Sequence, residues 1–409
     1  MQVAWSQLLD SVDYLPAGLS ISVQGALTVL GVPTTSPGSP DSSSGADPLP
    51  VPGPPRLTTF APDGSILTEE PIADVLEAPE EVVSLVGLLL GPAGERLTVH
   101  RVVRQSPSSE SLGSRALVMG AFEGTPTWST AANGTAYIEP LPPLAVSPTS
   151  TLVSLFVSAE GTVELNANEV AGEGCLVLAW LGWNGEVLAA VRTCPAASSI
   201  RDLAVSATDT LVLSQERRAP RWVEQGIVTR YDDLGAISAE SALEAEEGAI
   251  PHVLFAASWG TLVALSATGR LLFGPLYEST PVGSRAVLVG LEADLSTRWT
   301  RPLDATGPCQ ITAVAQGPGA DVLVGGSFEG VLTTDAGVLT TVTRSGFVLR
   351  IDPLGHVVEH IALPSFSDGD AFVPTTLRLH ADWLACVGYS FVATSTTAHA
   401  RVAVARVDL

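Results

Sequence analysis

The chain ends in RVAVARVDL (Arg401–Leu409), a stretch with the residue types of a β-strand but with no second strand after it. Its β-branched valines and its lack of glycine and proline favour an extended conformation. Every similar stretch upstream is followed by a tight turn and a partner strand. The stretch QVAWSQLL (Gln2–Leu9) resembles those partner strands but has nothing before it. We therefore predict that the first strand of the chain pairs with the last.

An internal repeat with a period near 60 residues supports this pairing. One repeated unit is LAVSPTSTLVSLF (Leu144–Phe156), which recurs 59 residues later as LAVSATDTLVLSQ (Leu203–Gln215) and predicts two strands, A and B. The other unit is a hairpin of an apolar strand C, a short turn and a strand D. Its six complete copies have the turn residues Gly64, Gly124, Gly185, Gly235, Ser296 and Gly355. The two ends of the chain together supply a seventh copy.

These copies predict an all-β fold, a seven-bladed β-propeller with four antiparallel strands in each blade. Residues 1–409 form a single domain in this prediction, and the N-terminal strand completes the C-terminal blade and closes the ring. The C strands are almost continuously apolar, as in LVLAWL (Leu176–Leu181), which is expected for a sheet that is covered on both faces. The Pro- and Ser-rich stretch 33–55 is predicted to be an extended loop insertion in the first blade.

The composition excludes some classes of partner. The chain has 43 acidic residues against 20 basic ones, all of them arginine, and a net charge of −23. Such a charge repels phosphate backbones, so we expect no nucleic-acid binding. The longest apolar run, VVSLVGLLLG (Val82–Gly91), is about half the length that a membrane span needs, so we expect no membrane insertion. MQVAWSQLLD lacks the features of a signal peptide, so the chain is either made without one or numbered from a mature end.

Residues from Val322 onward, VLVGGSFEGVLTT…GFVLRIDPLGHVVEHIAL, resemble the repeat of the bacterial β-propeller proteins common in myxobacteria and their relatives. In that family a VxGxF strand, a Gly/Thr-rich loop and an AFVxKxDxxGxxxW hairpin recur. The resemblance is strong in the sixth copy and blurred in the first four, and Arg350 stands where the family has lysine. It implies a non-catalytic, often exported propeller without a specific ligand or cofactor. An extracellular or cell-surface location is favoured, with a cytoplasmic one as the alternative.

The long connections are predicted to lie on one face of the propeller. The A–B and C–D turns are short, whereas the B–C and D–A connections are long and share a face in a propeller. The B–C loops are 32–55, 105–114, 159–174, 216–225, 270–283, 331–344 and 392–400, and the D–A loops include 71–81, 131–143 and 364–374. Because loops on a rigid frame often carry binding groups, we expect this face to bind a partner. Loop lengthening without function is the alternative.

The B–C loop of the fourth blade contains RRAPRW (Arg217–Trp222), a basic segment in an acidic chain. Arg217, Arg218, Arg221 and Trp222 could grip a carboxylate, a sugar or an acidic edge of a partner protein. The alternative is local: EAEE (Glu244–Glu247), in the next loop on the same face, neutralises these arginines.

Two segments contain residue types that bind metal ions. Asp368 and Asp370 in SFSDGDAF (Ser365–Phe372) have oxygens that Ca²⁺ favours, but Ca²⁺ needs more ligands than two aspartates supply, so a plain Asp-Gly turn is the main interpretation. HVVEH (His356–His360) matches a zinc-peptidase pattern that requires a helix. Because this segment follows a turn and has the pattern of an outer strand, we predict that its match to the zinc-peptidase pattern is fortuitous and that no metal binds there.

A cross-strand disulfide is a further prediction. If Asn184-Gly185 forms a two-residue hairpin turn, Cys175 lies directly opposite Cys194, and a Cys175–Cys194 bond or two free thiols remain equally open. We also interpret the D-strand tryptophans, Trp5, Trp128 and Trp299, as packing anchors between blades.

Two functions follow from these observations. The first is a non-enzymatic propeller that binds a protein or glycan partner, or is a structural component of a surface or extracellular assembly. The alternative is a propeller-type hydrolase or lyase whose acidic residues converge at the mouth of the channel, a geometry that the sequence alone does not reveal.

Overall fold

The described residues of the computed structural model are 1–12, 14–22, 24–33, 56–71, 81–90, 95–105, 111–122, 125–134, 138–146, 153–159, 162–165, 168–171, 175–182, 184–193, 199–206, 209–217, 223–232, 236–273, 284–366, 371–393 and 398–409. Within these ranges the regular structure is entirely β, and all strand pairs are antiparallel. The prediction of an all-β, antiparallel chain is therefore confirmed.

Among the described residues, the strands form seven sheets of four or six strands, which we number in chain order, and one small sheet. Sheet 1 contains β2 (Tyr14–Ile21), β3 (Leu27–Pro33), β4 (Arg56–Phe60) and β5 (Ile66–Pro71). Sheet 2 contains β6 (Glu81–Leu90), β7 (Glu95–Gln105), β8 (Ser111–Phe122) and β9 (Thr125–Gly134), extended by β12 (Thr162–Leu165) and β13 (Asn168–Ala171). Sheet 3 contains β10 (Ile138–Val146), β11 (Val153–Ala159), β14 (Cys175–Leu181) and β15 (Val187–Thr193).

Sheet 4 contains β16 (Ser199–Val205), β17 (Thr210–Arg217), β18 (Glu224–Tyr231) and β19 (Ile237–Leu243). Sheet 5 contains β20 (Gly248–Ala257), β21 (Gly260–Thr268), β22 (Ser284–Leu291) and β23 (Thr297–Pro302). Sheet 6 contains β25 (Cys309–Gln316), β26 (Val322–Phe328), β29 (Ser345–Ile351) and β30 (Val357–Ala362). Sheet 7 contains β31 (Phe372–His380), β32 (Trp383–Ala393), β33 (Ala398–Asp408) and β1 (Gln2–Val12), and the small sheet contains β24 (Asp304–Ala305), β27 (Val331–Thr334) and β28 (Gly337–Thr340).

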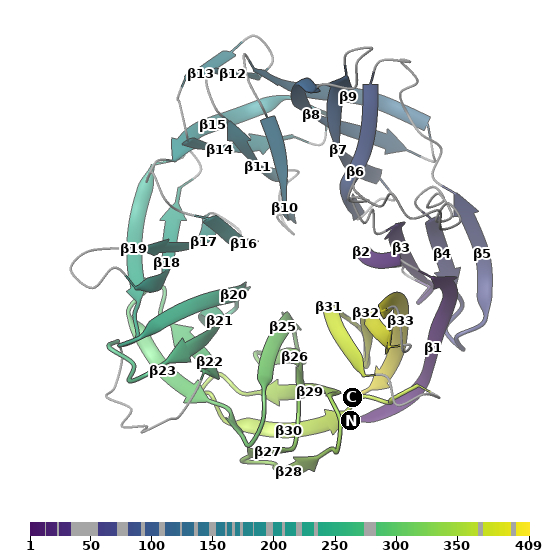
Figure 1. Cartoon of the computed structure of the whole chain (residues 1–409), viewed down its shortest axis with the longest axis vertical. Helices are drawn as coiled ribbons and strands as arrows, with labels where there is room; N and C mark the ends of the chain where they lie inside the picture. Colours follow the sequence, from purple (N-terminus) through teal and green to yellow (C-terminus); the bar gives the residue numbers. More distant parts are fainter. Residues whose placement is uncertain are drawn as a thin grey trace, which may run out of the picture.

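The sheets stand around a common centre, with one strand of each nearest to it, which is the arrangement of a β-propeller (Figure 1). The two ends of the chain lie next to each other in the same figure. The strand β1 pairs with β33 from Gln2 opposite Asp408 to Val12 opposite Arg401. The predicted pairing of the first strand with the last is therefore present.

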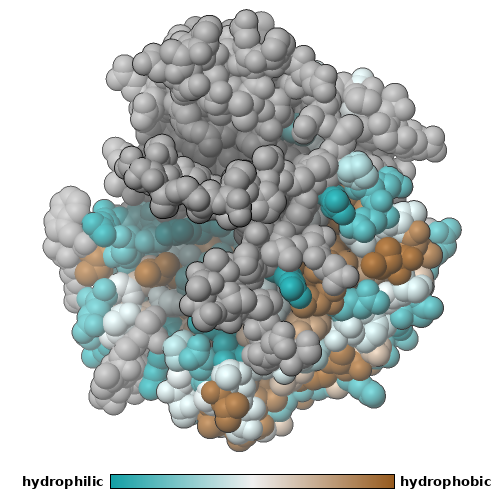
Figure 2. All heavy atoms as spheres, turned by 45° about the vertical axis from the view of Figure 1, so that its right-hand side comes forward, coloured by the Kyte–Doolittle hydropathy of each residue, from teal (hydrophilic) through white to brown (hydrophobic). Residues whose placement is uncertain are grey.

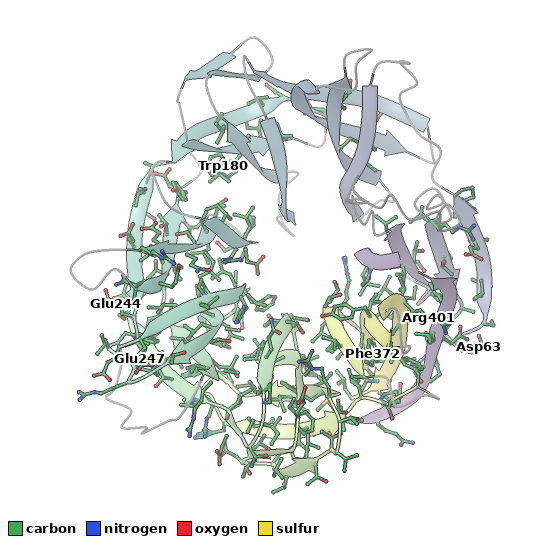
Figure 3. The ribbon with its side chains drawn as sticks, viewed as in Figure 1. Asp63, Trp180, Glu244, Glu247, Phe372 and Arg401 are labelled. Atoms are coloured by element: carbon green, nitrogen blue, oxygen red, sulfur yellow. The ribbon has the colours of Figure 1, made fainter. Side chains whose placement is uncertain are left out.

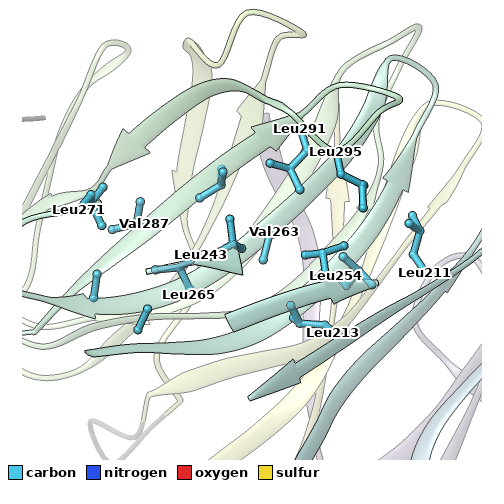
Figure 4. Packing of buried hydrophobic residues seen from close by; sticks show 14 of the residues in the cluster. Leu211, Leu213, Leu243, Leu254, Val263, Leu265, Leu271, Val287, Leu291 and Leu295 are labelled. Carbon is cyan, nitrogen blue, oxygen red and sulfur yellow. The ribbon is translucent and has the colours of Figure 1, made fainter. Parts of the chain in front are cut away.

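The core of the protein lies between neighbouring sheets. In the central strand β21, Val263 and Leu265 face sheet 4, whereas Leu262 and Ala264 face sheet 6, and all four side chains are fully buried. Figure 4 shows how the leucines and valines of sheets 4 and 5 fill the space between them. Burial on both faces is the reason why these strands are almost continuously apolar instead of alternating.

The C–D turns of sheets 1, 3, 5 and 6 share one geometry, which corrects two details of the prediction. At the turn of sheet 3, Gly182 N–H donates to Glu186 O, Gly185 N–H donates to Gly182 O, and Gly185 has a φ of 81°. This three-residue loop with a bulge replaces the predicted two-residue Asn-Gly turn. In sheet 5 the equivalent positive φ of 64° belongs to Leu295, not to the predicted turn residue Ser296.

The predicted role of the D-strand tryptophans is confirmed for Trp299. Its indole Nε1–H donates to Pro353 O at 3.1 Å, so the outer strand of sheet 5 rests on the C–D turn of sheet 6. Gly355 in that turn has a φ of 87°, and a Cβ there would lie 2.6 Å from Cδ2 of Trp299. Only glycine fits this position, because the backbone is left-handed and the indole ring covers it.

The same contact joins sheet 7 to sheet 1. Trp5 Nε1–H donates to Pro62 O at 3.0 Å, and a Cβ on Gly64 would lie 2.8 Å from Cδ2 of Trp5. Gln7 Nε2 donates to Gly64 O at 2.5 Å. The junction between the last and first sheets thus repeats the junction between sheets 5 and 6. The side chain of Trp128, the third predicted anchor, lies outside the described residues.

Two segments that were predicted to be loops form hairpins instead. Residues 159–174 contain β12 and β13, and residues 331–344 contain β27 and β28. The strand β12 pairs with β9 of sheet 2, and β27 pairs with β24, the short strand that follows sheet 5. The β12–β13 hairpin therefore leaves sheet 3 and extends the outer edge of sheet 2, where β9 offers unpaired backbone groups. The β27–β28 hairpin leaves sheet 6 and forms the small sheet with β24. The D–A connection 131–143 is also shorter than predicted, because β9 extends to Gly134 and β10 begins at Ile138.

Candidate functional site

A row of polar side chains crosses sheet 4 at the end of the sheet that carries its B–C loop. We call Arg201, Gln215, Arg217 and Glu224 the arginine strip. Arg201 is on β16, Gln215 and Arg217 are on β17, and Glu224 begins β18. The row lies across three neighbouring strands because β16 pairs with β17 and β17 pairs with β18.

Hydrogen bonds link the four side chains in sequence. Arg201 Nε donates to Gln215 Oε1 at 2.8 Å, and its Nη2 donates to the same oxygen. Gln215 Nε2 donates to Glu224 Oε2 at 2.5 Å, and Arg217 Nε donates to Glu224 Oε1 at 2.6 Å. The Glu224 carboxylate is therefore held between a neutral amide and a guanidinium, and each arginine is fixed through its Nε.

The electrostatics of the strip keep Glu224 ionised. The hydrogen bond from Gln215 is the largest cause that lowers the pKa of Glu224, followed by the hydrogen bond and charge of Arg217, while desolvation opposes them. The side chain of Arg217 is 64% exposed and that of Glu224 is 28% exposed. Arg217 thus presents most of its guanidinium to solvent while its carboxylate partner anchors one edge.

Two titratable groups lie beside the strip, and both have structural contacts. His252 on β20 shares a 2.7 Å hydrogen bond with Ser266 Oγ, and burial, with a smaller effect from the Arg201 charge, lowers the pKa of His252. Asp202 follows Arg201 on β16, and its carboxyl oxygens accept the N–H groups of Leu203 at 2.8 Å and Leu254 at 2.7 Å. Burial raises the pKa of Asp202 to about 7. Because Leu254 belongs to β20, Asp202 ties the inner strands of sheets 4 and 5 together.

The chemistry of the strip is that of binding. Guanidinium groups stay protonated at any physiological pH and present planar, paired N–H donors that match a carboxylate. The one carboxylate of the strip accepts hydrogen bonds from Gln215 and Arg217 and has a lowered pKa, which is the opposite of what a general acid needs.

The structure places only part of the predicted basic segment. Arg217 lies in the strip, whereas Arg218, Arg221 and Trp222 lie outside the described residues. The alternative interpretation proposed neutralisation by Glu244–Glu247, but Arg217 pairs with Glu224 of its own hairpin. Figure 3 shows Glu244 and Glu247 at the outer side of sheets 4 and 5.

Most other predicted site residues are not described. Asp368, Asp370 and Cys194 lie outside the described residues, and of Cys175 only the backbone is described, so the calcium site and the disulfide stay predictions. The β14–β15 register, with Leu176 opposite Thr193, is the one from which that disulfide was predicted. Elsewhere in the described chain, Cys309 and Cys386 are free thiols.

The segment HVVEH is a turn and a strand, as predicted, and not a helix. His356 Nδ1 lies 3.2 Å from Asp352 Oδ2, and His360 Nδ1 shares a 2.8 Å hydrogen bond with Thr334 Oγ1. The two histidines therefore have separate partners, Asp352 in the C–D turn of sheet 6 and Thr334 on β27. Among the residues that the structure describes, no group of three or more His, Cys, Asp or Glu side chains is arranged to hold a metal ion.

Sequence reasoning missed Arg201, Gln215 and Glu224. A signal for Gln215 and Glu224 is present in the sequence, because Gln215 ends a predicted strand and Glu224 lies in the predicted loop 216–225, both close to the basic segment. Arg201 was hidden because the register of β16 and β17 shifts between Ile200 and Asp202, a bulge that turns Arg201 out of the regular alternation.

No family model and no curated protein matches this chain, so the resemblance to myxobacterial-type repeats stays a prediction. Among solved structures, the chain is similar to BBS1N in complex with ARL6DN (11% identity, 98% of this chain and 95% of that chain, TM-score 0.45). It is also similar to the β-propeller domain of the Trilobed protease from Pyrococcus furiosus (8%, 95% and 93%, TM-score 0.46) and to the polysaccharide lyase Uly1 (8%, 100% and 100%, TM-score 0.49). All three TM-scores are below 0.5, so no function is transferred from these proteins.

The described surface mixes polar and apolar residues (Figure 2). The exposed large hydrophobic side chains include Ile66, Leu67, Leu188 and Ile237, which lie on the outer strands of three different sheets. Within the described ranges, none of the elements is a helix with the length and apolar character needed to cross a bilayer.

Proposed function

We propose that the chain is a closed seven-bladed β-propeller that acts as a non-catalytic scaffold for a protein or glycan partner, or as a structural part of a surface or extracellular assembly. The closure is supported by the pairing of β1 with β33 and by the contact of Trp5 with the turn at Gly64, which copies the contact of Trp299 at Gly355. The inner strands of the two sheets are also in contact, because Arg378 Nη1 on β31 of sheet 7 donates to Leu19 O on β2 of sheet 1 at 3.3 Å.

The binding face in this proposal is the one that carries the B–C and D–A connections. The observation that carries it is the arginine strip, where two arginines are oriented by cross-strand hydrogen bonds at the B–C end of sheet 4. Side chains that are fixed before a partner arrives lose less conformational entropy on binding. In a chain of net charge −23, a fixed pair of exposed guanidiniums is a distinct local feature.

The alternative of a hydrolase or lyase has one observation in its favour. Asp202 has a pKa raised to about 7, which is a property of general acids. Both of its oxygens, however, accept backbone N–H groups, and one of those groups belongs to the neighbouring sheet. These contacts are those of a structural link between sheets, so we favour the scaffold.

Loop exchange tests the binding face. The purified protein is screened against glycan and peptide arrays, and the screen is repeated after residues 218–222 are replaced by a short Gly/Ser linker. A matched variant exchanges the A–B turn at 207–208 of the same sheet, on the opposite face. We expect the loop variant to lose binding and the turn variant to keep it. Binding that survives the loop exchange but not the turn exchange would contradict the proposed face.

A further inference from the structure

We propose that the arginine strip docks an acidic segment of a partner protein, whose carboxylates pair with Arg201 and Arg217. This inference rests on the proposed function and names the chemistry of the partner. Carboxylates are the natural ligands of guanidinium groups because two parallel N–H donors match the two carboxylate oxygens.

The free donors of the strip support this assignment. Gln215 occupies Nε and Nη2 of Arg201, and Glu224 occupies Nε of Arg217. Among the described residues, the Nη1 group of Arg201 and both Nη groups of Arg217 have no partner. A guanidinium has five N–H donors, so these terminal N–H groups are left for a ligand.

The charge of the strip is also complementary to an acidic ligand. Two guanidiniums and the single Glu224 carboxylate leave a net charge of +1, and His252 next to them is held neutral by its lowered pKa. The buried Asp202 carboxyl points its oxygens at Leu203 and Leu254 rather than at the strip. Within the strip the one carboxylate is that of Glu224, whose two oxygens accept hydrogen bonds from Gln215 and Arg217.

A protein segment fits this site better than a nucleic acid or a glycan. The chain as a whole carries a charge of −23, which repels a long polyanion, whereas two or three acidic side chains contact only the strip. Glycan sites usually add an aromatic ring for stacking. The described aromatic rings of the surrounding sheets pack against one another instead, as in the Trp180–Tyr231 pair and the Trp259–Trp299 pair.

The strip gives this proposal an unusual test, because its variants should change affinity in opposite directions. Arg217→Gln and Arg201→Gln each remove a charge-assisted contact, so we expect roughly tenfold weaker binding. Glu224→Gln removes the competing carboxylate and should tighten binding several-fold. Loss of folding cannot imitate a gain in affinity. Arg344→Gln is the matched control, because Arg344 is also a half-exposed arginine in an ion pair, 3.3 Å from Glu329 on sheet 6, outside the strip.

The measurement is fluorescence anisotropy with a labelled Asp/Glu-rich peptide, compared with a Lys-rich peptide and with an oligoglucuronate of equal charge. Of the three ligands, we expect only the acidic peptide to bind, and its affinity should fall as the salt concentration rises. Glu224→Gln should bind it most tightly, wild type and Arg344→Gln should bind it equally, and Arg217→Gln should bind it most weakly. Equal affinity of wild type and Arg217→Gln, or weaker binding by Glu224→Gln, would overturn the proposal. Preferred binding of oligoglucuronate would overturn it in favour of a glycan. If the acidic peptide fails but a ligand from the array screen is lost on loop exchange, the binding face stands and only the acidic partner is refuted.

Discussion

The contact between sheet 7 and sheet 1 can be tested with a single methyl group. Gly64 has a φ of 88°, and a Cβ on it would lie 2.8 Å from Cδ2 of Trp5. Gly25, in the A–B turn of the same sheet, has a similar φ of 79°, but the nearest atom to its Cβ, Cγ of Pro62, is 3.6 Å away. Alanine at both positions therefore brings the same backbone strain, and only Gly64→Ala adds a collision.

The magnitudes follow from these distances. A left-handed alanine costs about 1–2 kcal/mol, which is the whole effect expected for Gly25→Ala because 3.6 Å is an ordinary contact. Displacing the indole ring adds about 1–3 kcal/mol of overpacking, so the free energy of unfolding should fall by about 2–5 kcal/mol in Gly64→Ala. The difference between the two variants isolates the contact of Trp5 with the turn.

The assay is guanidinium chloride unfolding followed by far-UV circular dichroism, with each glycine variant made in the wild type and in a Trp5→Leu background. In the Trp5→Leu background, Gly64→Ala should cost no more than Gly25→Ala, because the ring that it collides with is gone. Equal costs of the two glycine variants in the wild type, or an excess cost of Gly64→Ala that persists without Trp5, would refute the reasoning.

Three further predictions concern stability. The Asp202 carboxyl has a folded pKa of about 7, above its usual value of 3.8, so between these pH values it keeps a proton that the unfolded state has lost. It therefore contributes stability that is fully present below pH 3.8 and is lost as pH rises to about 7. Asp202→Asn should flatten this pH dependence of the denaturation midpoint, and an unchanged slope would contradict the assignment. Ala381 is exposed and has a φ of 52° in the turn between β31 and β32. Ala381→Gly should therefore raise the free energy of unfolding by about 0.5–1 kcal/mol. A lower free energy of unfolding would show that alanine causes no strain in this turn. Trp299→Phe loses both the hydrogen bond to Pro353 O and part of the buried ring, so the free energy of unfolding should fall by about 1–3 kcal/mol in the same assay, and no change would contradict the contact.

The sequence was informative wherever the fold repeats. The hairpin copies and the unmatched strands at the two ends predicted the C–D pairs and the β1–β33 pair, because strand patterning and turn spacing are local properties that recur with the period. The D-strand tryptophans were readable for the same reason. Leu295 was missed because leucine is unusual at a positive φ, and its burial at 2% exposure is what holds it there.

The candidate site was less accessible to sequence reasoning. Arg217 stood out as part of a basic segment, but its partner Glu224 is set by the cross-strand register, which a loop of uncertain length obscures. Arg201 is brought beside Gln215 by a bulge, and bulges leave no clear mark in the residue pattern. The hairpin β27–β28 is not predicted by the sequence pattern because its pairing partner, β24, is a two-residue strand that follows sheet 5.

The most direct test of the closed ring is a covalent link between its first and last strands. Gln2 and Asp408 are both exposed and lie directly opposite each other in the β1–β33 pair. In the Gln2→Cys/Asp408→Cys variant, mild oxidation followed by trypsin should yield a disulfide-linked pair of peptides, 1–56 and 407–409, neither of which contains a native cysteine. The pairing predicts near-complete formation of this link in the folded protein and little in Gln2→Cys/Asp304→Cys. Equal, low yields in both variants would mean that the ends of the chain do not meet.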